Sequence, residues 1–592
     1  MLKIRKIWPF FRKSKEVSDD SRPLDYSAHY EAVGVPSNLH YPATTLGEVL
    51  DQTARRYGDN PAVIYGPTTL TYKQLRKKVD RTAAGLVQLG VRPGDRVVLT
   101  LPNCTPYMVL FLAVQKIGAV VVNAGPLMGK DDLKKLLTMT EPTAVVGLDL
   151  QSEMLADAGA ELIDVRWIWV SLAEYIGFWK RLGYHVKRWS THPKIPEHQE
   201  QTTLEKMRQI APSRPPSIDP KMDDVALLQP TGGTTGVLKV AQLTHRNLLA
   251  NAAQTTAWTG LRSGQESVLG ILPMFHVYGL STCLVNVIYN GAAVILMTRF
   301  RAQALIEKIL KHRPSVLPLV PAIIDAVCDE VEGDAELQEK LRAAIEGRLV
   351  LSGAAPLPAG AERRFEQLFG SRIVQGYGLT EASPVTHLNP IDRPRTSSIG
   401  LPLPDTLVRI MDLSDKTKAA ASGESGELLI SGPQVMVGYL GGPDANENMF
   451  SVDETGRRWL HTGDVVRVDG DGYFFVVDRE KDMINRAGLK VWPAKVERVL
   501  RMSPRVRDVA VVGVKDETHT EAVVAYIVAE TLSDDPQNTQ LATELRSLSK
   551  EHLAPYEVPG AFEFVKELPR SGLGKMLKHR LGEADSKDRE KV

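Results

Sequence analysis

The stretch that decides the fold is Thr231-Gly232-Gly233-Thr234-Thr235-Gly236-Val237-Leu238-Lys239. Its three glycines allow backbone N–H groups to turn toward a phosphate, and its threonine hydroxyls add further donors. Its lysine brings a full positive charge to the same place. Apolar runs at residues 225–228 and 239–243 predict a strand on each side. The sequence therefore predicts a strand–loop–strand unit that holds a polyphosphate.

The Walker A loop, G-x-x-x-x-G-K-[ST], is a different phosphate loop, and this chain does not match it. Lys239 lies three residues after Gly236 instead of directly after it, and Val240 stands where a magnesium-binding Ser or Thr would be. A helix is predicted only later, with Thr244 as its N-cap. The loop is thus a hairpin loop and not a helix N-terminus. Taken alone, it could equally be a surface turn without a ligand.

Composition limits the classes of protein that the chain can be. Its 592 residues allow about four domain-sized units, and 43% hydrophobic with 24% charged residues can bury a large core. A net charge of +1 argues against a nucleic-acid binder. The three cysteines (Cys104, Cys283 and Cys328) lack metal-ligand spacing, which suits a reducing cytoplasm. No uninterrupted apolar run reaches the ~18 residues that a membrane span needs.

The order of predicted elements indicates an α/β protein with two unequal parts. From about residue 45 to 477, strands such as 96–101 and 119–123 alternate with amphipathic helices, which predicts mainly parallel sheets covered by helices. Residues 397–477 change to short strands and Gly turns, which suggests a small β-barrel. The final part predicts a helix at 493–501, strands at 509–514 and 522–528, a helix at 541–552 and a strand near Phe562. We expect an N-terminal extension (1–44), a large domain of two such sheets (45–478, with the β-barrel at 396–478) and a compact α+β domain (479–592).

Five further motifs follow the phosphate loop along the chain. They are residues 375–381 (QGYGLTE), 426–430 with Gly438-Tyr439, 459–464 (WLHTGD), 478–484 (DREKDMI) and 569–575 (PRSGLGK). Together with the loop, read as T-[SG]-G-T-T-G-x-x-K, they resemble the adenylate-forming superfamily in both content and order. That superfamily holds acyl- and aryl-CoA ligases, peptide-synthetase adenylation domains and luciferases. The resemblance spans residues 45–580, and the chain is most like a bacterial long-chain fatty acyl-CoA ligase.

The resemblance implies a reaction in two halves that uses ATP, Mg²⁺ and coenzyme A. A carboxylate first attacks the α-phosphate of ATP and expels pyrophosphate, and a thiol then attacks the acyl adenylate. Both first reactants are anions, so neutralising charge and aligning the reactants are the main catalytic tasks. The implied catalytic residues are Thr380 on the α-phosphate, Glu381 on Mg²⁺ and Lys575. Thr235 is the second implied metal ligand, and both ligands offer the oxygen that Mg²⁺ prefers.

Lys575 would bridge the substrate carboxylate and the α-phosphate, because an anionic carboxylate needs no general base. Tyr377 would offer a flat face to adenine, while Asp464, presented on a tight turn, and Arg479 would hold the ribose. Taken alone, each of these residues could be an ordinary surface or turn residue; the surrounding motifs favour the functional interpretation. The nucleotide- and CoA-binding residues that the resemblance implies are Thr231, Gly232, Gly233, Thr234, Thr235, Gly236, Lys239, Gly353, Ala354, Ala355, Gln375, Gly376, Tyr377, Asp464, Arg479, Lys481 and Gly488.

The second half-reaction implies a mobile C-terminal domain. In the resembling family this domain swings about a hinge that corresponds to Lys481, and it offers a segment containing Gly488 to the pantetheine arm of CoA. Glycine permits the close backbone approach that such a thin chain needs. The segment departs from the family pattern at Arg486-Ala487 and at Lys490.

The substrate carboxylate is expected beside residues 273–279, where His276, Val277, Tyr278 and Gly279 form the predicted pocket. Peptide-synthetase domains have an Asp at the place of His276 to hold the amino group of their substrate. An amino-acid substrate is therefore disfavoured. His276 either packs beside the acyl carboxylate or is simply a buried histidine of the pocket. Fatty, aryl and other acyl acids all remain open at this point.

Two segments mix aromatic with basic residues, residues 1–13 and 178–189. This mixture suits the headgroup region of an anionic bilayer, although a tail or a surface loop would also account for it. We expect a cytoplasmic monomer or homodimer that touches the inner face of the membrane peripherally. The function we expect is a long- or medium-chain fatty acid:CoA ligase. The alternatives are an acyl-AMP ligase that serves a carrier protein, an aryl-CoA ligase and a non-catalytic acyl or nucleotide sensor.

Overall fold

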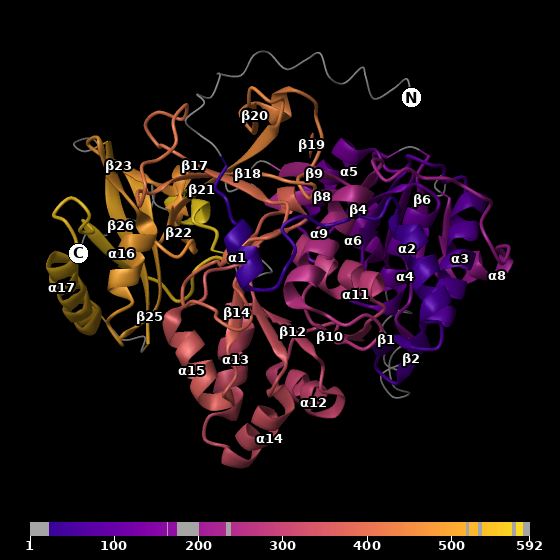
Figure 1. Ribbon diagram of the computed structural model, residues 1–592, viewed down its shortest axis with the longest axis horizontal. Coiled ribbons are helices and arrows are strands. Elements are labelled where there is room, and N and C mark those ends of the chain that lie inside the picture. Colours follow the sequence, from indigo (N-terminus) through magenta and orange to yellow (C-terminus); the bar gives the residue numbers. More distant parts are fainter. Residues whose placement is uncertain are drawn as a thin grey trace.

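A computed structural model of the chain (Figure 1) describes residues 23–162, 164–173, 200–232, 238–516, 520–530, 535–570 and 576–583. Its first sheet has eight strands in the order β19-β9-β8-β4-β3-β5-β6-β7. The strands are β3 (Arg96–Thr100), β4 (Val120–Asn123), β5 (Ala144–Leu148), β6 (Arg166–Val170), β7 (Gln201–Thr203), β8 (Val225–Gly232), β9 (Leu238–Thr244) and β19 (Gly438–Tyr439). From β8 to β7 all pairs are parallel, whereas β9 and β19 add antiparallel pairs at one edge.

The second sheet has nine strands in the order β16-β15-β14-β13-β12-β10-β11-β1-β2. They are β1 (Pro61–Tyr65), β2 (Thr68–Thr71), β10 (Ser267–Gly270), β11 (Ala293–Leu296), β12 (Val316–Leu319), β13 (Leu349–Ser352), β14 (Ile373–Gly378), β15 (Val385–Leu388) and β16 (Leu401–Pro402). The run from β14 to β1 is parallel. Two mainly parallel sheets are therefore confirmed.

Helices cover both sheets. They are α2 (Leu46–Arg56), α3 (Tyr72–Gln88), α4 (Thr105–Lys116), α5 (Lys130–Thr140), α6 (Ser152–Ala158), α8 (Leu204–Ile210), α9 (His245–Thr259), α10 (Val277–Leu280), the π-helical turn η5 (Ser281–Val285), α11 (Asn286–Asn290), α12 (Ala302–His312), α13 (Pro321–Val331), α14 (Ala335–Ile345) and α15 (Ala359–Phe369). Residues 105–115 of α4 are all buried, as expected of a helix that is apolar on every side. One core cluster joins α4 to Val97 of the first sheet and Leu269 of the second, so the two sheets share a core. None of the described helices is both long and apolar enough to cross a membrane.

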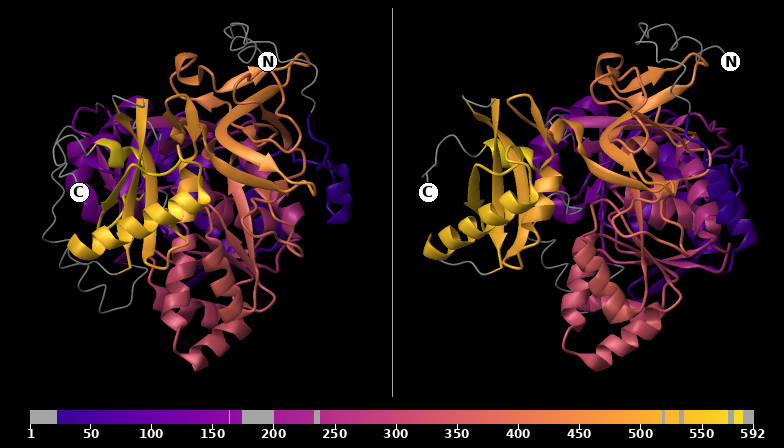
Figure 2. Two further views of the ribbon diagram at one scale, coloured as in Figure 1. Left: turned by 90° about the vertical axis from the view of Figure 1, so that its left-hand side faces the viewer. Right: turned by 60° about the vertical axis from the view of Figure 1, so that its left-hand side comes forward.

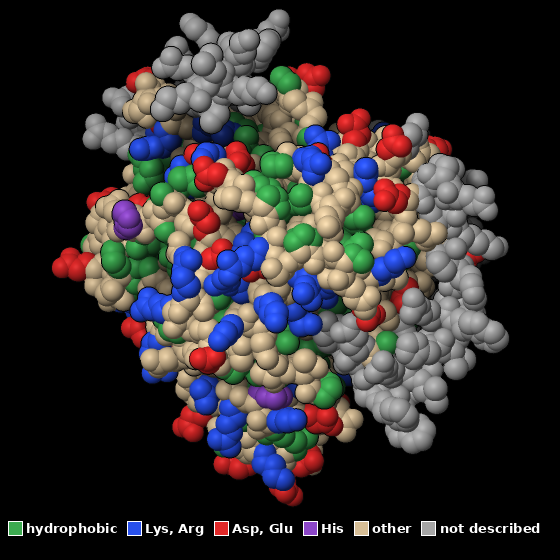
Figure 3. All heavy atoms as spheres, turned by 90° about the vertical axis from the view of Figure 1, so that its right-hand side faces the viewer, with side chains coloured by type: hydrophobic (Ala, Val, Ile, Leu, Met, Phe, Trp, Pro, Cys, Tyr) green, Lys and Arg blue, Asp and Glu red, His purple; other side chains and the backbone are tan. Residues whose placement is uncertain are grey.

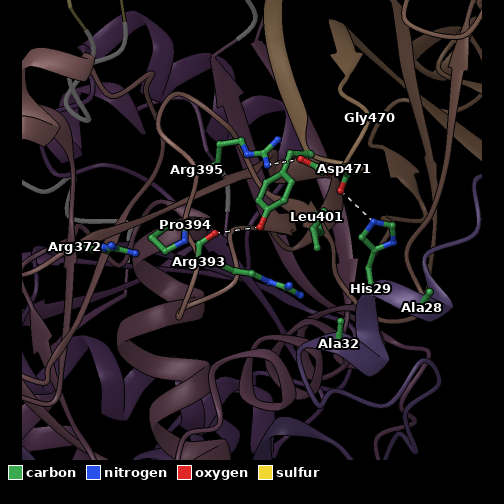
Figure 4. A pocket seen from close by; sticks show the side chains of 11 residues that line it. Ala28, His29, Ala32, Arg372, Arg393, Pro394, Arg395, Leu401, Gly470 and Asp471 are labelled. Carbon is green, nitrogen blue, oxygen red and sulfur yellow. Dashed lines mark hydrogen bonds and ion pairs between the residues drawn. The ribbon is translucent and has the colours of Figure 1, made fainter.

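A smaller antiparallel sheet follows, formed by β17 (Leu407–Met411), β18 (Gly426–Ser431), β20 (Phe450–Val452), β21 (Arg458–Val468) and β22 (Phe474–Arg479). Its closure into a β-barrel stays a prediction. Helix α1 (Ser27–Ala32) packs on this sheet, because Tyr30 and Phe474 belong to one core cluster. Figure 4 shows the hollow beside this helix, where the Nε2 atom of His29 lies 3.1 Å from the backbone oxygen of Asp471.

The C-terminal part is an α+β unit with its own core, seen in yellow and gold at the left of Figure 1 and again in Figure 2. It contains β23 (Ile484–Arg486), β24 (Leu489–Val491), α16 (Pro493–Leu500), β25 (Val506–Asp516), β26 (Thr520–Ala529), α17 (Asp535–His552), β27 (Ala561–Phe564) and α18 (His579–Glu583). The expected order of helices and strands is confirmed, although α17 begins six residues earlier than the sequence predicted. The domain boundaries and the mobility of this unit stay predictions.

Candidate active site

The phosphate loop lies between β8 and β9, which pair as an antiparallel hairpin in which Thr231 is opposite Lys239. The Thr244 side chain caps α9 by accepting from the backbone N–H of Asn247. The hairpin and the later helix are thus confirmed. Residues 233–237, which include the predicted ligands Gly233, Thr234, Thr235 and Gly236, lie outside the described residues.

A buried tyrosine connects this hairpin to the predicted metal ligand. The Tyr439 hydroxyl donates a hydrogen bond to the Glu381 carboxylate. The Nζ atom of Lys239 lies 4.9 Å from the centre of the Tyr439 ring, within range of a cation–π interaction. Burial and the neighbouring Glu381 raise the pKa of Tyr439, so its hydroxyl keeps its proton. Because β19 pairs with β9, the ring is held between the lysine and the carboxylate.

Glu381 has the chemistry that a magnesium site needs. It lies in the short 3-10 helix η6 (Thr380–Ala382), and its backbone oxygen accepts from the N–H of Met436 at 2.8 Å. Among the described residues, no group of three or more His, Cys, Asp or Glu side chains could hold a metal alone. Mg²⁺ in nucleotide enzymes is commonly held by one or two carboxylates together with phosphate oxygens, so a single carboxylate fits.

A second cluster lies where the ribose is expected. The Nε atom of Arg479 lies 3.0 Å from one Asp464 oxygen, and the Tyr377 hydroxyl donates to the other oxygen. Asp464 is only 3% exposed. Burial, with the Asp464 charge close by, raises the pKa of Tyr377 well above its usual value, so the hydroxyl stays a donor. Each carboxylate oxygen has a second lone pair with which it can accept from a sugar hydroxyl.

The local structure at Asp464 corrects the sequence prediction. The residue does not lie on a tight turn but inside strand β21, directly opposite Arg479 of β22. The register between β18 and β21 shifts just before it, and Gly463 adopts a φ of 67°. This irregularity re-aims the strand without ending it, as β-bulges do.

The remaining nucleotide-binding predictions fall at the carboxyl ends of adjacent parallel strands. Gln375 and Gly376 lie in β14, and Gly353-Ala354-Ala355 follows β13, its neighbour. Ligands of open α/β sheets bind at this edge. Ala354 has a φ of 69°, a conformation that non-glycine residues seldom adopt.

The predicted acyl pocket meets the nucleotide region at Tyr278. A Cβ atom on Gly353 would lie 3.4 Å from the Tyr278 ring. Burial lowers the pKa of His276 to about 4, so this histidine is neutral at pH 7 and cannot act as a cation toward the substrate carboxylate. Gly279 packs so tightly that a Cβ would lie 2.2 Å from the Pro273 oxygen, which leaves room only for glycine.

Asp478 connects the last strand of the small sheet to the C-terminal unit. Its carboxylate accepts from the backbone N–H of Ala494, in the first turn of α16, at 2.7 Å. Burial raises its pKa to about 6. Lys481 follows in the 3-10 helix η8 (Glu480–Asp482), and Gly488 adopts a φ of 87° between β23 and β24.

One continuous cavity brings most of these residues together. It is lined by Thr231, Lys239, His276, Val277, Tyr278, Gly353, Ala354, Ala355, Gln375, Gly376, Tyr377, Thr380, Glu381, Asp464, Arg479 and Lys481. Gly279 and Gly488 are described but are not among its lining residues. Lys575 lies outside the described residues, but Arg570 and Met576, on either side of residues 571–575, line the cavity.

Sequence reasoning assigned no role to two of the residues that organise this site. Tyr439 belongs to the Gly438-Tyr439 motif, and Asp478 begins the motif at the domain junction. Their presence in those motifs was a usable signal. Their contacts could not be inferred, because both depend on pairing between distant segments.

Two family models match the chain: AMP-binding enzyme at residues 50–440 and AMP-binding enzyme C-terminal domain at residues 495–575. The chain is 34% identical to a long-chain-fatty-acid–CoA ligase of Bacillus subtilis, over 94% of this chain and 97% of that protein. It is 32% identical to a feruloyl-CoA synthase of Amycolatopsis, over 90% and 97%.

Among solved structures, an anthranilate CoA ligase in complex with anthranoyl-AMP shares the fold. Its TM-score is 0.77 at 21% identity, with 92% of this chain and 98% of that chain covered. Both family models match, in the same order as the motifs along the chain. The chain therefore belongs to the AMP-binding enzyme family of adenylate-forming enzymes and is an AMP-forming acid–thiol ligase.

Proposed function

We propose that this enzyme activates a long- or medium-chain fatty acid with ATP and transfers the acyl group to coenzyme A. The observation that carries the proposal is a channel that extends the cavity away from Tyr278. Thr282 of η5 and Asn286 and Asn290 of α11 line it at four-residue intervals, continuing from Tyr278 of α10. From residue 278 to residue 290 a helix advances about 18 Å.

Apolar strand residues form the facing wall of this channel. They are Val268 of β10, Val316 of β12, and Leu349 and Leu351 of β13. An aromatic acid would occupy only the part nearest Tyr278, whereas an extended acyl chain would follow the whole length. The similarity to the Bacillus subtilis fatty-acid ligase points the same way.

The first half-reaction uses fixed charges of the large domain. Lys239 and Thr231 would hold the departing pyrophosphate, and Thr380 would contact the α-phosphate. Glu381 would hold Mg²⁺, which neutralises phosphate charge when bound. Lys575 would enter from the C-terminal unit, between the carboxylate and the α-phosphate, where charge develops as the bond forms.

Adenosine would be held by the second cluster. Asp464 accepts from the ribose hydroxyls while Arg479 and Tyr377 keep its carboxylate in place. For the second half-reaction, rotation about Lys481 would remove Lys575 and bring the exposed turn at Gly488 to the pantetheine arm. The positive φ of Gly488 allows the backbone to turn there without a side-chain clash.

A pyrophosphate-release screen over acids of graded chain length, with and without CoA, tests the proposal. We expect release to rise with chain length, and acyl-CoA to form only when CoA is present. Release confined to aryl acids would identify an aryl-CoA ligase, for which the similarity to the feruloyl-CoA synthase is the supporting observation. Acyl-AMP without any thioester would indicate a carrier-protein partner, and no release from any acid would indicate a sensor.

We also propose that the enzyme meets anionic membranes through the face that carries α3. Lys73, Lys77 and Arg81 are exposed at four-residue spacing on this helix, and Arg55 and Arg56 are exposed at the end of α2. None of the five forms an ion pair with a described residue. Figure 3 shows Lys and Arg side chains gathered across the middle of this face.

Near an anionic surface each such side chain contributes about 1 kcal/mol. The two aromatic and basic segments, 1–13 and 178–189, lie outside the described residues. In flotation assays the full chain should bind anionic vesicles more strongly than neutral ones, and a Lys73→Glu/Lys77→Glu/Arg81→Glu variant should bind the anionic vesicles less than the full chain does. A chain lacking residues 1–20 tests the first segment in the same assay. Equal flotation of the variant and the full chain would exclude the α3 face.

A further inference from the structure

The acyl channel has one apolar wall and one polar wall. Because residues four apart lie on the same side of a helix, Thr282, Asn286 and Asn290 form a polar stripe that runs away from the reacting end. Thr255 and Thr259 of α9, also four apart, line the channel beside this stripe. A wall that met only methylene groups would gain nothing from such side chains.

Several polar atoms of the stripe lack partners among the described residues. The Nδ2 atom of Asn290 donates to the Thr256 hydroxyl at 2.8 Å, but its Oδ1 atom is buried and unpaired, and the residue is only 2% exposed. The Oδ1 atom of Asn286 lies 3.1 Å from the Thr255 hydroxyl. Neither the Asn286 Nδ2 group nor the Thr282 hydroxyl has a hydrogen-bond partner in the described part of the chain.

Burying polar groups without partners is costly, so an occupant that pairs with them is favoured over one that does not. The Asn290 Oδ1 atom is closed off from the channel and so cannot pair with an occupant. The Asn286 Nδ2 group, which can only donate, and the Thr282 hydroxyl, which can donate or accept, are the groups that an occupant can reach. A hydroxyl group both donates and accepts, so one hydroxyl can pair with both groups. An unsubstituted chain satisfies neither.

We propose that Thr282 and Asn286 of this stripe select acyl chains that carry a hydroxyl group beyond the reacting end. The substrate class is therefore hydroxylated fatty acids. This inference rests on the proposed fatty acid:CoA ligase function. The apolar wall of Val268, Val316 and Leu351 packs against the methylene groups of the same chain.

The test compares palmitate with chain-matched analogues that carry a hydroxyl in mid-chain or at the terminal carbon. Pyrophosphate release gives kcat/KM for each acid with the full-length enzyme. For the hydroxyl position that reaches the stripe we expect kcat/KM at least about tenfold above that of palmitate, because a site that hydrogen-bonds a hydroxyl rejects the analogue without it.

Two variants and one control locate the effect. Asn286→Leu and Thr282→Val should each lower the ratio of hydroxylated to plain kcat/KM about three- to tenfold and raise kcat/KM for palmitate. Thr282→Val nearly keeps the side-chain shape and leaves no described partner unpaired. Ser281→Ala removes a neighbouring hydroxyl that is more deeply buried than that of Thr282 and does not line the channel, and it should leave the ratio unchanged.

The outcomes separate this inference from the function on which it rests. Equal kcat/KM for plain and hydroxylated chains, unchanged in both variants, would mean that the stripe holds only water, and it would refute the inference while leaving the ligase function intact. A fall in the ratio with Ser281→Ala as large as with Thr282→Val would also refute it. No pyrophosphate release from any fatty acid would refute the proposed function and the inference together.

Discussion

Replacing Tyr439 by phenylalanine tests whether Glu381, the predicted metal ligand, is positioned through the hairpin of β8 and β9. The change removes the hydroxyl that donates to Glu381 but keeps the ring beside Lys239. A hydrogen bond to a charged group contributes about 1.5–3 kcal/mol. If this hydrogen bond stabilises the transition state by that amount, kcat/KM for pyrophosphate release should fall about 10- to 100-fold in the variant, since each factor of ten corresponds to 1.36 kcal/mol.

The assay is pyrophosphate release at saturating fatty acid, with Mg²⁺ titrated at fixed ATP. Because Glu381 would lose its orienting donor, the Mg²⁺ concentration for half-maximal rate should rise, whereas a purely structural role would lower the rate equally at every Mg²⁺ concentration. Tyr473→Phe is the matched control, since its hydroxyl donates to the backbone oxygen of Arg393 outside the catalytic cavity. A Tyr439→Phe rate within twofold of wild type at limiting Mg²⁺ would refute the positioning role.

Three further predictions concern the junction and the C-terminal unit. Lys575→Ala should abolish carboxylate-dependent pyrophosphate release but spare thioester formation from supplied acyl-AMP, and surviving release would disprove its bridging role. Lys481→Pro should reduce thioester formation more than adenylation, so equal losses in the two half-reactions would exclude a hinge there. Burial raises the pKa of Asp478 from its ordinary 3.8 to about 6, so the folded state binds more protons between these values. The free energy of unfolding should therefore fall by up to about 3 kcal/mol as the pH rises from 4 to 6 and then level off. Urea unfolding of the wild-type enzyme across this pH range should show that fall. The same fall in Asp478→Asn would contradict its assignment to Asp478.

The local sequence was sufficient to predict the phosphate hairpin and the helix that follows it. The apolar runs on either side of the loop predicted two strands, which the structure pairs as a hairpin. Thr244 predicted the start of a helix, because its side chain can accept a hydrogen bond from a backbone N–H of the first turn. The alternation that predicted parallel sheets is equally local, because each strand–helix unit carries its own periodicity. These features follow from nearby residues, and they are the ones that the structure confirms.

Contacts between segments far apart in the sequence could not be predicted from local sequence patterns. Asp464 looked like a turn residue because Gly463 precedes it, yet β21 pairs with β18 on both sides of the glycine and with β22 at Asp464, so the strand continues past an irregularity instead of ending in a turn. The contact from Tyr439 to Glu381 exists because β19 pairs with β9, two strands nearly 200 residues apart in sequence. The resemblance supplied a role for Glu381 but none for the tyrosine that holds it.

The clusters around Glu381 and Asp464 limit what the C-terminal unit has to supply to the site. Tyr439 donates a hydrogen bond to the Glu381 carboxylate, and Arg479, the last residue of β22, pairs with the Asp464 carboxylate, so both carboxylates are already oriented. His276, predicted beside the substrate carboxylate, carries no charge at pH 7 and so does not neutralise that carboxylate. We expect a cation for the reacting carboxylate to come from residues 571–575, because Arg570 and Met576 on either side of them line the cavity. If that charge enters with residues 571–575, withdrawing this segment would switch off adenylation while leaving the bound nucleotide held, which is the property that an enzyme with two successive half-reactions requires.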